Sequence, residues 1–488
     1  MVALSSVTCP FCGSLCDDIE LVIQGNTITR VRNACAIGEA KFLSHSHDRP
    51  KAPLIRKDGK LVESSWKEAI QKSAEILAKA SYPILYGWSS TSCEAIKKGL
   101  ELAEEVGGVI DNTSTVCHGP SVLSIHDIGM SSCTLGQLRH RADLIIYWGC
   151  NPWEAHPRHV ERYTAFSNGR FQESSWKRYS LHSRITQLFK RLQRFSMAQG
   201  YKAPSPASHP ANNGGHLPPT MLRSGRKMMV VDVRRTRSAD SADYFLQVKP
   251  NSDYELLQAL HMLVRGEDLD VEEVAGIPVE LLEDVADVLI SCDLGVIFFG
   301  VGLTMSAGKL RNIDAALSLV RELNTRTKFL IMPMRGHFNV TGANVVSTWQ
   351  TGYPYAVDFS RGYPQYNPGE TSVVDILSRR ESDAGLVIAS DPVSNFPRDA
   401  VQHLVKNPLI VIDPVETPTS LMADVVLPST FVGIETEGTA YRMDHVPLPL
   451  KKVVQPPKNI LSDEKILQRI IDEVRIIKGV RIPVEASD

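Results

Sequence analysis

Long apolar runs, a secretory leader and an excess of one charge are all missing from this sequence of 488 residues. It contains no uninterrupted apolar stretch of about eighteen residues, so it offers no candidate membrane span. Its N-terminus lacks a basic region followed by a long apolar run, so we expect a soluble cytoplasmic protein. The 53 Lys and Arg nearly balance the 55 Asp and Glu, which gives no overall case for nucleic acid or membrane binding. The length predicts about two to four domains.

The nine cysteines do not suggest a secreted disulfide framework, because four of them crowd the first 35 residues. Cys9, Cys12, Cys16 and Cys35 follow the spacing C-x2-C-x3-C-x18-C. We interpret them as ligands of a [4Fe–4S] cluster, because three thiolates on one tight loop can bind three corners of a cubane. A predicted β-hairpin over residues 19–31, with a Gly-Asn turn, would return the fourth cysteine to the loop. A structural zinc site is the alternative, although zinc sites usually pair two C-x2-C knuckles.

A second candidate site lies at residues 114–121, where Cys117 and His118 precede a Gly-Pro turn. The pattern predicts an exposed loop that places a soft thiolate ligand beside a proton-transfer group. An unremarkable thiol next to a surface imidazole is the alternative interpretation of this segment alone.

Beyond about Lys51 the sequence alternates short apolar segments with longer segments of helical periodicity. Residues 66–79 and 93–106 have the apolar spacing of helices. The apolar segments are expected to be fully buried parallel strands. They are residues 82–87, 143–149, 228–234, 294–302, 328–332, 385–391 and 409–413. This alternation predicts a doubly wound α/β fold, in which ligands bind at the carboxyl ends of the strands.

Small or polar residues follow several of these predicted strands. Asp232, Asp391 and Asp413 stand at strand ends, where a carboxylate can accept hydrogen bonds from ribose hydroxyls or a guanine edge. A single aspartate in such a place could equally cap a helix. Together with Gly300-Val301-Gly302 and Asn151-Pro152, the set favours a large nucleotide-bearing cofactor.

One segment breaks the α/β pattern. From about Ser174 to Lys227 the sequence has ten Lys or Arg and no Asp or Glu. Residues 203–220 are rich in Pro, Ser, Asn and Gly and cannot form a core. The first half spaces apolar residues along one helical face, at Leu181, Ile185, Leu188, Leu192 and Phe195. We expect a solvated surface insertion, with a basic docking helix as the alternative.

Several motifs together resemble the molybdopterin oxidoreductases, which include formate dehydrogenases. They are the cysteine loop, Val116 to Pro120 and Met334 to Gly342. More closely, the chain resembles the catalytic B subunits of tungsten- or molybdenum-dependent formylmethanofuran dehydrogenases. This likeness rests on residues 16–20, 149–152, 156–159, 349–370, 389–392 and 435–444. The basic insertion is not part of the family pattern, and the spacing to Cys35 is shorter than in most formate dehydrogenases.

The resemblance implies a small N-terminal iron–sulfur domain and two doubly wound, Rossmann-like α/β domains of the molybdopterin oxidoreductase type. The cluster domain would span residues 1–50. The first cofactor-binding domain would combine residues 51–115 and 337–456, and the second would span 116–336 and contain the insertion. Residues 457–488 would form a C-terminal helix and tail.

The resemblance also implies the chemistry. Two molybdopterin guanine dinucleotides would hold tungsten or molybdenum, and Cys117 would add a further metal ligand. His118 would transfer a proton and Arg335 would grip a carboxylate, for the reversible reduction of carbon dioxide to formate in methanofuran formylation and methanogenesis. Electrons would pass through the [4Fe–4S] cluster. The other residues expected to bind the cofactors are Lys41, Asn151, Asp232, Arg234, Gly300, Gly302, Asp391 and Asp413.

As partners, the resemblance implies an amidohydrolase subunit, a small barrel-type cap subunit, a further formyl-handling or structural subunit, and a ferredoxin-type electron donor. The alternative function is that of a non-redox scaffold in a formyltransferase/hydrolase complex. The cluster cysteines together with Cys117, His118 and Arg335 favour the enzyme, because a scaffold has no need of them.

Overall fold

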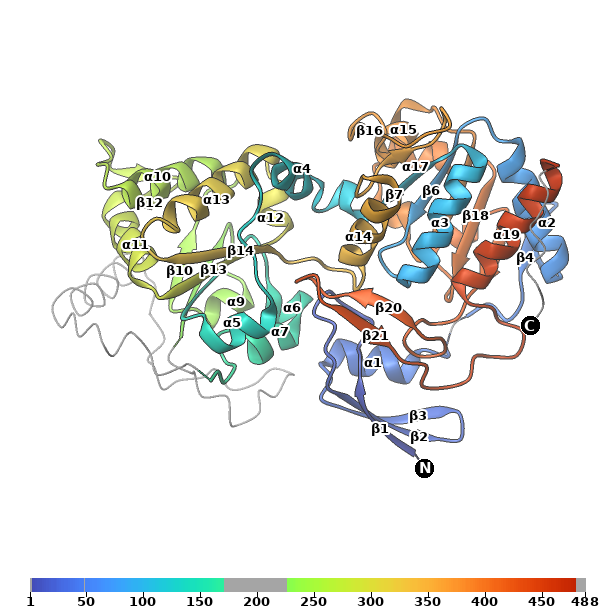
Figure 1. Cartoon of the computed structure of the whole chain (residues 1–488), viewed down its shortest axis with the longest axis horizontal. Coiled ribbons are helices and arrows are strands. Elements are labelled where there is room, and N and C mark those ends of the chain that lie inside the picture. The colour runs from blue at the N-terminus through green and yellow to red at the C-terminus, as the bar shows by residue number, and fades with distance from the viewer. Residues whose placement is uncertain (1, 48, 171–225, 480–488) are drawn as a thin grey trace. The chain divides into compact units, whose positions relative to one another are not determined.

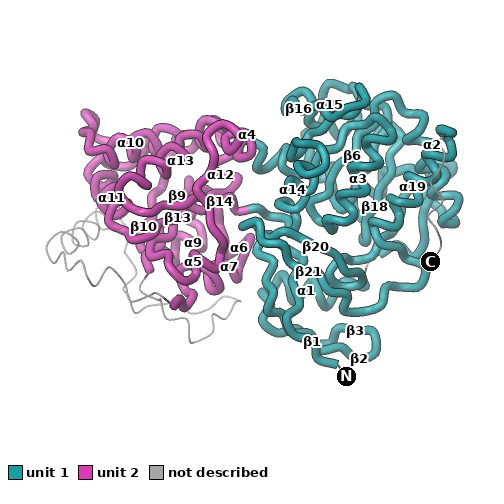
Figure 2. The backbone as a smooth tube through the Cα atoms, viewed as in Figure 1, with its two compact units in different colours: residues 1–119, 335–488 teal, residues 120–334 magenta. Residues whose placement is uncertain are grey.

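The computed structural model describes residues 2–47, 49–170 and 226–479. The chain divides into two compact units, which Figure 2 colours separately. Unit 1 consists of residues 1–119 and 335–488, and unit 2 of residues 120–334. The chain therefore leaves unit 1 directly after the Cys117 segment and re-enters it at Arg335.

The N-terminal part of unit 1 is a three-stranded antiparallel sheet, with order β1-β2-β3, followed by a short helix. The elements are β1 (Val2–Val7), β2 (Ile19–Gln24), β3 (Thr27–Arg32) and α1 (Ala36–Ser44). Strands β2 and β3 form the predicted hairpin, whose turn uses Gly25 in the left-handed conformation with φ +60°. The hairpin leads the chain back to Cys35, the N-cap residue of α1.

The main sheet of unit 1 has nine strands in the order β16-β15-β7-β6-β17-β18-β19-β4-β5. The five consecutive strands from β7 to β19 run parallel to one another. The strands are β4 (Leu54–Lys57), β5 (Lys60–Glu63), β6 (Pro83–Gly87), β7 (Val109–Asn112), β15 (Val357–Asp358), β16 (Gln365–Tyr366), β17 (Ala384–Ile388), β18 (Leu409–Asp413) and β19 (Val425–Pro428).

Helices cover both faces of this sheet (Figure 1). One face packs Leu85, Leu386 and Ile410 against α2 (Trp66–Lys79), α3 (Cys93–Val106), α14 (Val340–Thr351) and α19 (Asp463–Ile477). The other face packs Ile84 and Val387 against α15 (Val373–Arg379) and α17 (Arg398–Leu404). The remaining elements are the 3-10 turn η1 (Thr113–Val116), α16 (Pro392–Asn395), α18 (Pro418–Met422), β20 (Gly438–Tyr441) and β21 (Pro447–Leu450).

The helices predicted over residues 66–79 and 93–106 are confirmed, and their caps explain the bounds. Ser65 accepts a hydrogen bond from the Glu68 amide at 3.1 Å, which satisfies a free donor at the start of α2. Ser92 does the same for Ala95 at the start of α3, at 3.2 Å. Helix α3 ends at Gly107, whose φ of +66° is the left-handed cap that glycine adopts without strain.

Unit 2 contains a five-stranded, fully parallel sheet with order β10-β9-β8-β13-β14. The strands are β8 (Leu144–Trp148), β9 (Lys227–Asp232), β10 (Tyr244–Gln247), β13 (Leu294–Phe299) and β14 (Lys328–Pro333). Its largest core packs α10 (Asp253–Arg265), α11 (Val279–Ser291) and α13 (Leu310–Leu323) on this sheet. The other elements are α4 (Gly119–Ile128), α5 (Leu135–Arg141), α6 (Pro152–Ala155), α7 (Pro157–Tyr163), α9 (Arg237–Asp240), α12 (Val301–Thr304), β11 (Glu273–Val274) and β12 (Ile277–Pro278).

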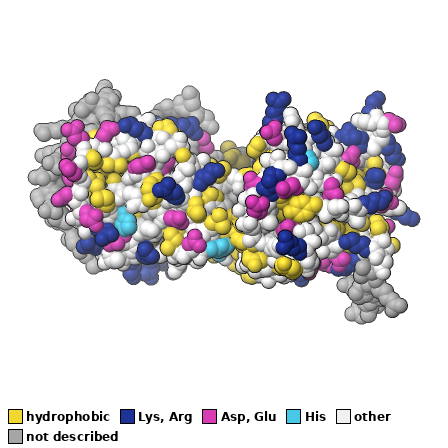
Figure 3. Space-filling view, turned by 90° about the horizontal axis from the view of Figure 1, so that it is seen from above, with side chains coloured by type: hydrophobic (Ala, Val, Ile, Leu, Met, Phe, Trp, Pro, Cys, Tyr) yellow, Lys and Arg dark blue, Asp and Glu magenta, His cyan; other side chains and the backbone are white. Residues whose placement is uncertain are grey.

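All seven predicted buried strands occur as parallel strands of the two sheets, within a few residues of the predicted bounds. Both units thus have the mixed α/β architecture that the alternating pattern predicts. On the face drawn in Figure 3, acidic and basic side chains are interspersed, as the balanced composition leads one to expect. Among the described residues no helix combines the length and apolar character needed to cross a membrane.

The predicted basic insertion lies mostly outside the described residues, which exclude 171–225. Its last two residues do not belong to a surface insertion. Arg226 is 4% exposed and donates hydrogen bonds to Thr164 O at 2.7 Å and to Ser167 Oγ at 2.6 Å, and Lys227 begins β9. The predicted end of the insertion is therefore wrong by at least these two residues. Arg226 is fixed by carbonyl and hydroxyl acceptors that no local pattern reveals.

Candidate active site

The four N-terminal cysteines lie together in unit 1. The Cys9 amide donates to Cys16 O at 2.8 Å, which closes the loop that carries three of them. The Cys35 sulfur accepts from the Gly38 amide at 3.4 Å at the start of α1. A Cβ atom built on Gly38 would lie 3.4 Å from Cys9 Sγ and 3.7 Å from Cys35 Sγ. The start of α1 therefore sits directly against sulfurs from both ends of the motif.

The electrostatics of these thiols suit a cationic ligand. Burial raises the pKa of Cys9 well above its usual value, and Cys12, Cys16 and Cys35 raise it further. Burial, together with the charge of Cys16, raises the pKa of Cys12 to about 12. Four thiolates could share this space only if a bound cation compensated them. Within the described ranges, no three His, Cys, Asp or Glu side chains gather in a way that would hold a single metal ion. A cubane, by contrast, takes one sulfur per iron.

The Cys117 segment differs from the predicted exposed loop. After β7 the chain forms η1, and the Cys117 amide donates to Ser114 O at 3.0 Å. His118 is fully buried and Cys117 partly buried, and α4 begins at Gly119. The prediction of exposure is wrong because buried amide side chains hold this turn. Asn112 Oδ1 accepts from the Ser114 amide at 2.8 Å, and Ser114 Oγ donates to Asn344 Oδ1 at 2.9 Å.

Cys117 and Arg335, which are remote in sequence, lie close enough to influence each other's ionisation. Burial raises the pKa of the Cys117 thiol to about 11, and the Arg335 charge opposes this rise. Burial likewise lowers the pKa of Arg335, to about 10, and Cys117 opposes that change. Arg335 is 3% exposed and still charged at neutral pH. The Cys117 thiol stays protonated there unless a metal ion displaces the proton.

The loop that carries Arg335 rests directly on the cysteine loop. The Gly13 amide donates to Gly336 O at 3.1 Å. A Cβ atom at Gly13 would come within 2.2 Å of Arg335 O, so any larger residue would push the two loops apart. Lys41 lies near both loops. Its Nζ is 5.4 Å from the centre of the ring of Phe11, in the cysteine loop. In the Arg335 loop, burial lowers the pKa of His337, and the charge of Lys41 lowers it further.

Asp391 and Asp413 follow adjacent parallel strands of unit 1, and each already has a partner within the protein. Asp391 Oδ1 accepts from Thr419, from the amide at 3.1 Å and from Oγ1 at 2.6 Å. Asp413 Oδ1 accepts from the Val415 amide at 3.0 Å, and burial raises its pKa to about 7. These contacts differ from the helix cap that the sequence offered as an alternative, because Asp391 makes no side-chain cap bond to α16 and Asp413 accepts from a turn. In this sheet the strand order reverses between β6 and β17, and Asp391 lies just beyond the end of β17.

The candidate residues of unit 2 meet at the corresponding edge of its own sheet, where the order reverses between β8 and β13. Asn151 follows β8, and its Oδ1 accepts from Ser238 Oγ at 2.6 Å. Its Nδ2 is buried and has no hydrogen-bond partner within the described part of the chain, so it could donate to a ligand. Asp232 ends the neighbouring strand β9 and accepts from the amide of Arg234, whose side chain is exposed.

Gly300 and Gly302 are explained first by packing. A Cβ atom on Gly302 would lie 2.7 Å from the Cα of Gly149, and one on Gly300 would lie 2.5 Å from the Cβ of Cys150. The Gly302 amide donates to Gly149 O at 3.0 Å. The ends of β8 and β13 therefore approach so closely that only glycine fits, which brings both close to Asn151.

Sequence reasoning missed Asp111 and His445. Asp111, at the end of β7, is 1% exposed and accepts from the amides of Asn112, Ala356 and Val373 at 2.8, 3.1 and 2.9 Å. A charged residue inside an apolar strand was the available signal. His445 lies near enough to Arg335 for that charge to lower its pKa, and no local pattern indicates this.

The chain matches the family model described as molybdopterin oxidoreductase over residues 49–178 and 207–473. The interruption at 179–206 falls within the predicted insertion. Over 473 residues the chain is 45% identical to the B subunit of tungsten-containing formylmethanofuran dehydrogenase 2 from Methanocaldococcus jannaschii, covering 96% of this chain and 98% of the relative. It is 42% identical to the protein of the same name from Methanococcus maripaludis, covering 98% and 100%.

Two solved structures share the fold at low sequence identity. One is acetylene hydratase from Pelobacter acetylenicus, with TM-score 0.65, 14% identity, and coverage of 97% of this chain and 70% of the other. The other is a chain of the formyltransferase/hydrolase complex from Methylorubrum extorquens with methylofuran, with TM-score 0.62, 20% identity, and coverage of 88% and 100%. The family match and the two full-length relatives show that this chain belongs to the molybdopterin oxidoreductases, and within them to the B subunits of tungsten-containing formylmethanofuran dehydrogenase.

Proposed function

We propose that this chain catalyses the reversible reduction of carbon dioxide to formate as the redox subunit of a formylmethanofuran dehydrogenase. In this reaction carbon dioxide takes up two electrons and one proton. The observation that carries the proposal is the pairing of the Cys117 thiol with the buried Arg335 guanidinium, on a loop stacked against four cysteines. A soft metal ligand, an anion-binding fork and a route for electrons are thereby combined in one unit.

Cys117 would ligate tungsten or molybdenum held by two molybdopterin guanine dinucleotides. When bound, this group supplies the two-electron redox couple. Asn151 fits such a ligand through its buried, unpartnered Nδ2 atom. The other residues proposed to contact the cofactors are Lys41, Asp232, Arg234, Gly300, Gly302, Asp391 and Asp413.

Cys9, Cys12, Cys16 and Cys35 would bind the [4Fe–4S] cluster in a domain formed by residues 1–50. Their mutual effect on pKa supports a site that a cationic cluster stabilises. Zinc, the alternative, would need the four sulfurs around one ion. Lys41, which lies near both loops, would sit between the cluster and the pterin.

Arg335 would bind the carboxylate of formate through two hydrogen bonds, and His118 would hold or accept the proton that accompanies the electrons. His118 is fully buried, so the proton it exchanges with the reacting carbon would have to reach or come from solvent through other groups. The product of this site would be formate itself, and the joining of formate to methanofuran would take place elsewhere.

Formate would pass to an amidohydrolase subunit, which joins it to the amine of methanofuran. A small barrel-type cap subunit, a further formyl-handling or structural subunit and a ferredoxin-type donor would complete a cytoplasmic hetero-oligomer. The similarity in fold to a chain of a multi-subunit complex supports an assembly of this kind.

That same similarity favours one second candidate, a non-redox scaffold in a formyltransferase/hydrolase complex. Several buried ionisable groups argue against the scaffold, namely the cluster cysteines, Cys117, His118 and Arg335. Burying such groups destabilises the fold, and a protein without redox chemistry would not need them.

The test is metal, pterin and iron analysis of the purified native complex, with a formate-dependent viologen assay. We expect tungsten or molybdenum, about four iron atoms per chain and dye reduction. Cys117→Ser should lower metal content and cut activity on the order of a hundredfold or more, because a hydroxyl replaces a soft thiolate. Cys133→Ser is the matched control in unit 2. A complex with neither metal nor dye reduction would establish the scaffold function.

A further inference from the structure

His445 occupies a backbone conformation that its side chain makes costly. It lies in the turn between β20 and β21, with φ +63°. The turn is tight, because the His445 amide donates to Arg442 O at 2.9 Å and the Arg442 amide to Val446 O at 3.0 Å. Glycine would adopt this conformation without strain, and histidine adopts it more often than most other residues do. Residues held in this region cluster at functional sites, although other non-glycine residues of this chain share it.

A buried ion pair lies in the part of the turn that directly precedes the histidine. Arg442 donates from Nε to Asp444 Oδ1 at 2.7 Å and from Nη2 to Asp444 Oδ2 at 2.8 Å. Their side chains are 9% and 0% exposed. A bidentate pair of this kind holds Asp444, the residue next to His445, in one position. The His445 backbone is held in turn by its amide bond to Arg442 O.

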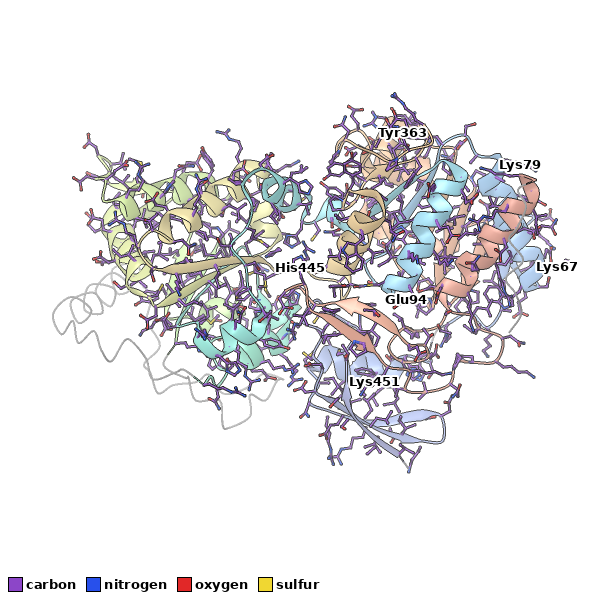
Figure 4. All side chains as sticks on the ribbon, viewed as in Figure 1. Lys67, Lys79, Glu94, Tyr363, His445 and Lys451 are labelled. Carbon is purple, nitrogen blue, oxygen red and sulfur yellow. The ribbon has the colours of Figure 1, made fainter. Side chains whose placement is uncertain are left out.

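The turn is tied to the loop that carries Arg335. The Met443 amide donates to Gly13 O at 3.0 Å, and the Gly13 amide donates to Gly336 O at 3.1 Å. The Tyr441 amide donates to Asn339 Oδ1 at 2.9 Å. Figure 4 labels His445 at this turn, beside the segment that leads into α14. These bonds bring the turn that carries His445 next to the loop that carries Arg335, and the charge of Arg335 influences the ionisation of His445.

The imidazole is available for a ligand and uncharged. The His445 side chain keeps exposed surface, and within the described ranges its ring makes no hydrogen bond. Partial desolvation by the neighbouring segments, and then the charge of Arg335, lower its pKa to about 4. A neutral imidazole offers one N–H donor and adds no second positive charge beside Arg335.

We propose that His445 is a further binding residue, which donates a hydrogen bond to the carboxylate that Arg335 receives. The inference rests on the proposed function, since formate is the carboxylate in question. A guanidinium fork uses two in-plane donors on the carboxylate, and the turn supplies a third from a different segment. The strained histidine is then explained by the ligand it contacts.

The test compares His445→Gly and His445→Asn in the native complex. Glycine adopts the same backbone without strain and removes the donor, whereas asparagine tolerates the conformation and keeps an amide donor. We expect His445→Gly to raise the formate KM about threefold to tenfold with a smaller change in kcat, as for one neutral hydrogen bond to a bound ligand. His445→Asn should recover part of the loss. Tungsten, pterin and iron content should stay at the wild-type level.

Arg380→Gly is the matched control, because Arg380 is an exposed residue of unit 1 with nearly the same φ of +64° and lies outside the candidate site. It should leave the formate KM unchanged. Formate binding is also measured by calorimetry, which needs no turnover. Inactive wild-type protein would refute the proposed redox function. In that case the calorimetric Kd of formate for wild type and for His445→Gly would still show whether His445 binds formate. Equal affinity of wild type and His445→Gly would overturn the inference, as would a parallel loss of tungsten and pterin, which would assign the imidazole to the cofactor.

Discussion

The two units follow one plan and use it for different chemistry. Each has a sheet whose strand order reverses once, between β6 and β17 in unit 1 and between β8 and β13 in unit 2. Polar residues follow the strands at both reversals, where open α/β sheets bind ligands. In unit 2 these are Asn151 and Asp232, next to closely packed glycines and the Cys150 thiol, whose pKa burial raises. In unit 1 they are Asp413 and the pair of Cys117 and Arg335, whose charges influence each other.

The difference lies in the segments added to the sheet. Unit 1 surrounds its sheet edge with the cysteine loop, the Arg335 loop and the β20–β21 turn, which are joined through backbone hydrogen bonds of Gly13. The parallel strands provide a rigid sheet edge, and the loops next to that edge supply the side chains that can bind or react with a ligand. We therefore expect changes in unit 1 to affect the reaction, and equivalent changes in unit 2 to affect cofactor retention.

The largest effect should come from the cluster. Cys12→Ala removes one of four proposed iron ligands, and we expect loss of most of the iron and of the charge-transfer absorbance, with formate-dependent dye reduction falling on the order of a hundredfold or more. Iron analysis and the visible spectrum provide the measurement. Cys133→Ala in unit 2 should keep both. Full iron content in Cys12→Ala would refute the cluster assignment.

The next largest effect should come from replacing one arginine by lysine in unit 1 and comparing it with the same replacement in unit 2. Arg335→Lys keeps the charge and loses the two-point grip, so we expect kcat/KM for formate to fall about thirtyfold or more. Arg234→Lys in unit 2 should lower pterin content and leave the KM of the loaded fraction unchanged. Equal kinetic effects from both substitutions would contradict the division between the units.

A buried ion pair in unit 1 and an exposed ion pair in unit 2 should contribute differently to stability. Arg49 Nη1 lies 2.5 Å from Glu435 Oε1, with side chains 5% and 2% exposed. Glu435→Gln should lower the free energy of unfolding by about 3 kcal/mol or more, because Arg49 would keep a buried, uncompensated charge. Lys249 and Glu273 in unit 2 are 62% and 56% exposed, so Glu273→Gln should cost less than about 1 kcal/mol. Urea unfolding of both variants measures the difference.

The last contrast concerns pH. Burial raises the folded-state pKa of Asp413 from 3.8 to about 7, so the native state holds its proton more tightly than the unfolded chain. Stability should therefore fall as pH rises from about 4 to about 7, and the penalty should be complete above that range. Asp413→Asn should gain up to about 4 kcal/mol over wild type near pH 8, because the pKa rises from 3.8 to about 7 on folding, and almost nothing near pH 4. Asp232→Asn, at a less buried strand end, should show a weaker trend in the same urea titration. A gain that does not depend on pH would exclude titration of Asp413 as its cause.

The sequence by itself determined the local elements. Helices α2 and α3 have the predicted bounds, since apolar periodicity and the Ser65 and Ser92 caps are encoded by near neighbours. The seven buried strands and the β2–β3 hairpin were predicted for the same reason. Strand-end positions of Asp232, Asp391 and Asp413 followed from the strands, and the cysteine spacing indicated a shared site.

Only the tertiary structure decided which of these residues meet and in what surroundings. The burial of His118, the closeness of Cys117 to Arg335 and the placement of His445 depend on strand order and on contacts between segments that are remote in sequence. The predicted exposure of residues 114–121 was wrong because Asn112 and Asn344 bury that turn. Local periodicity reports which face of an element is apolar, whereas a site is formed where close-packed segments fit together, and a clash such as a Cβ at Gly13 is decided only in three dimensions.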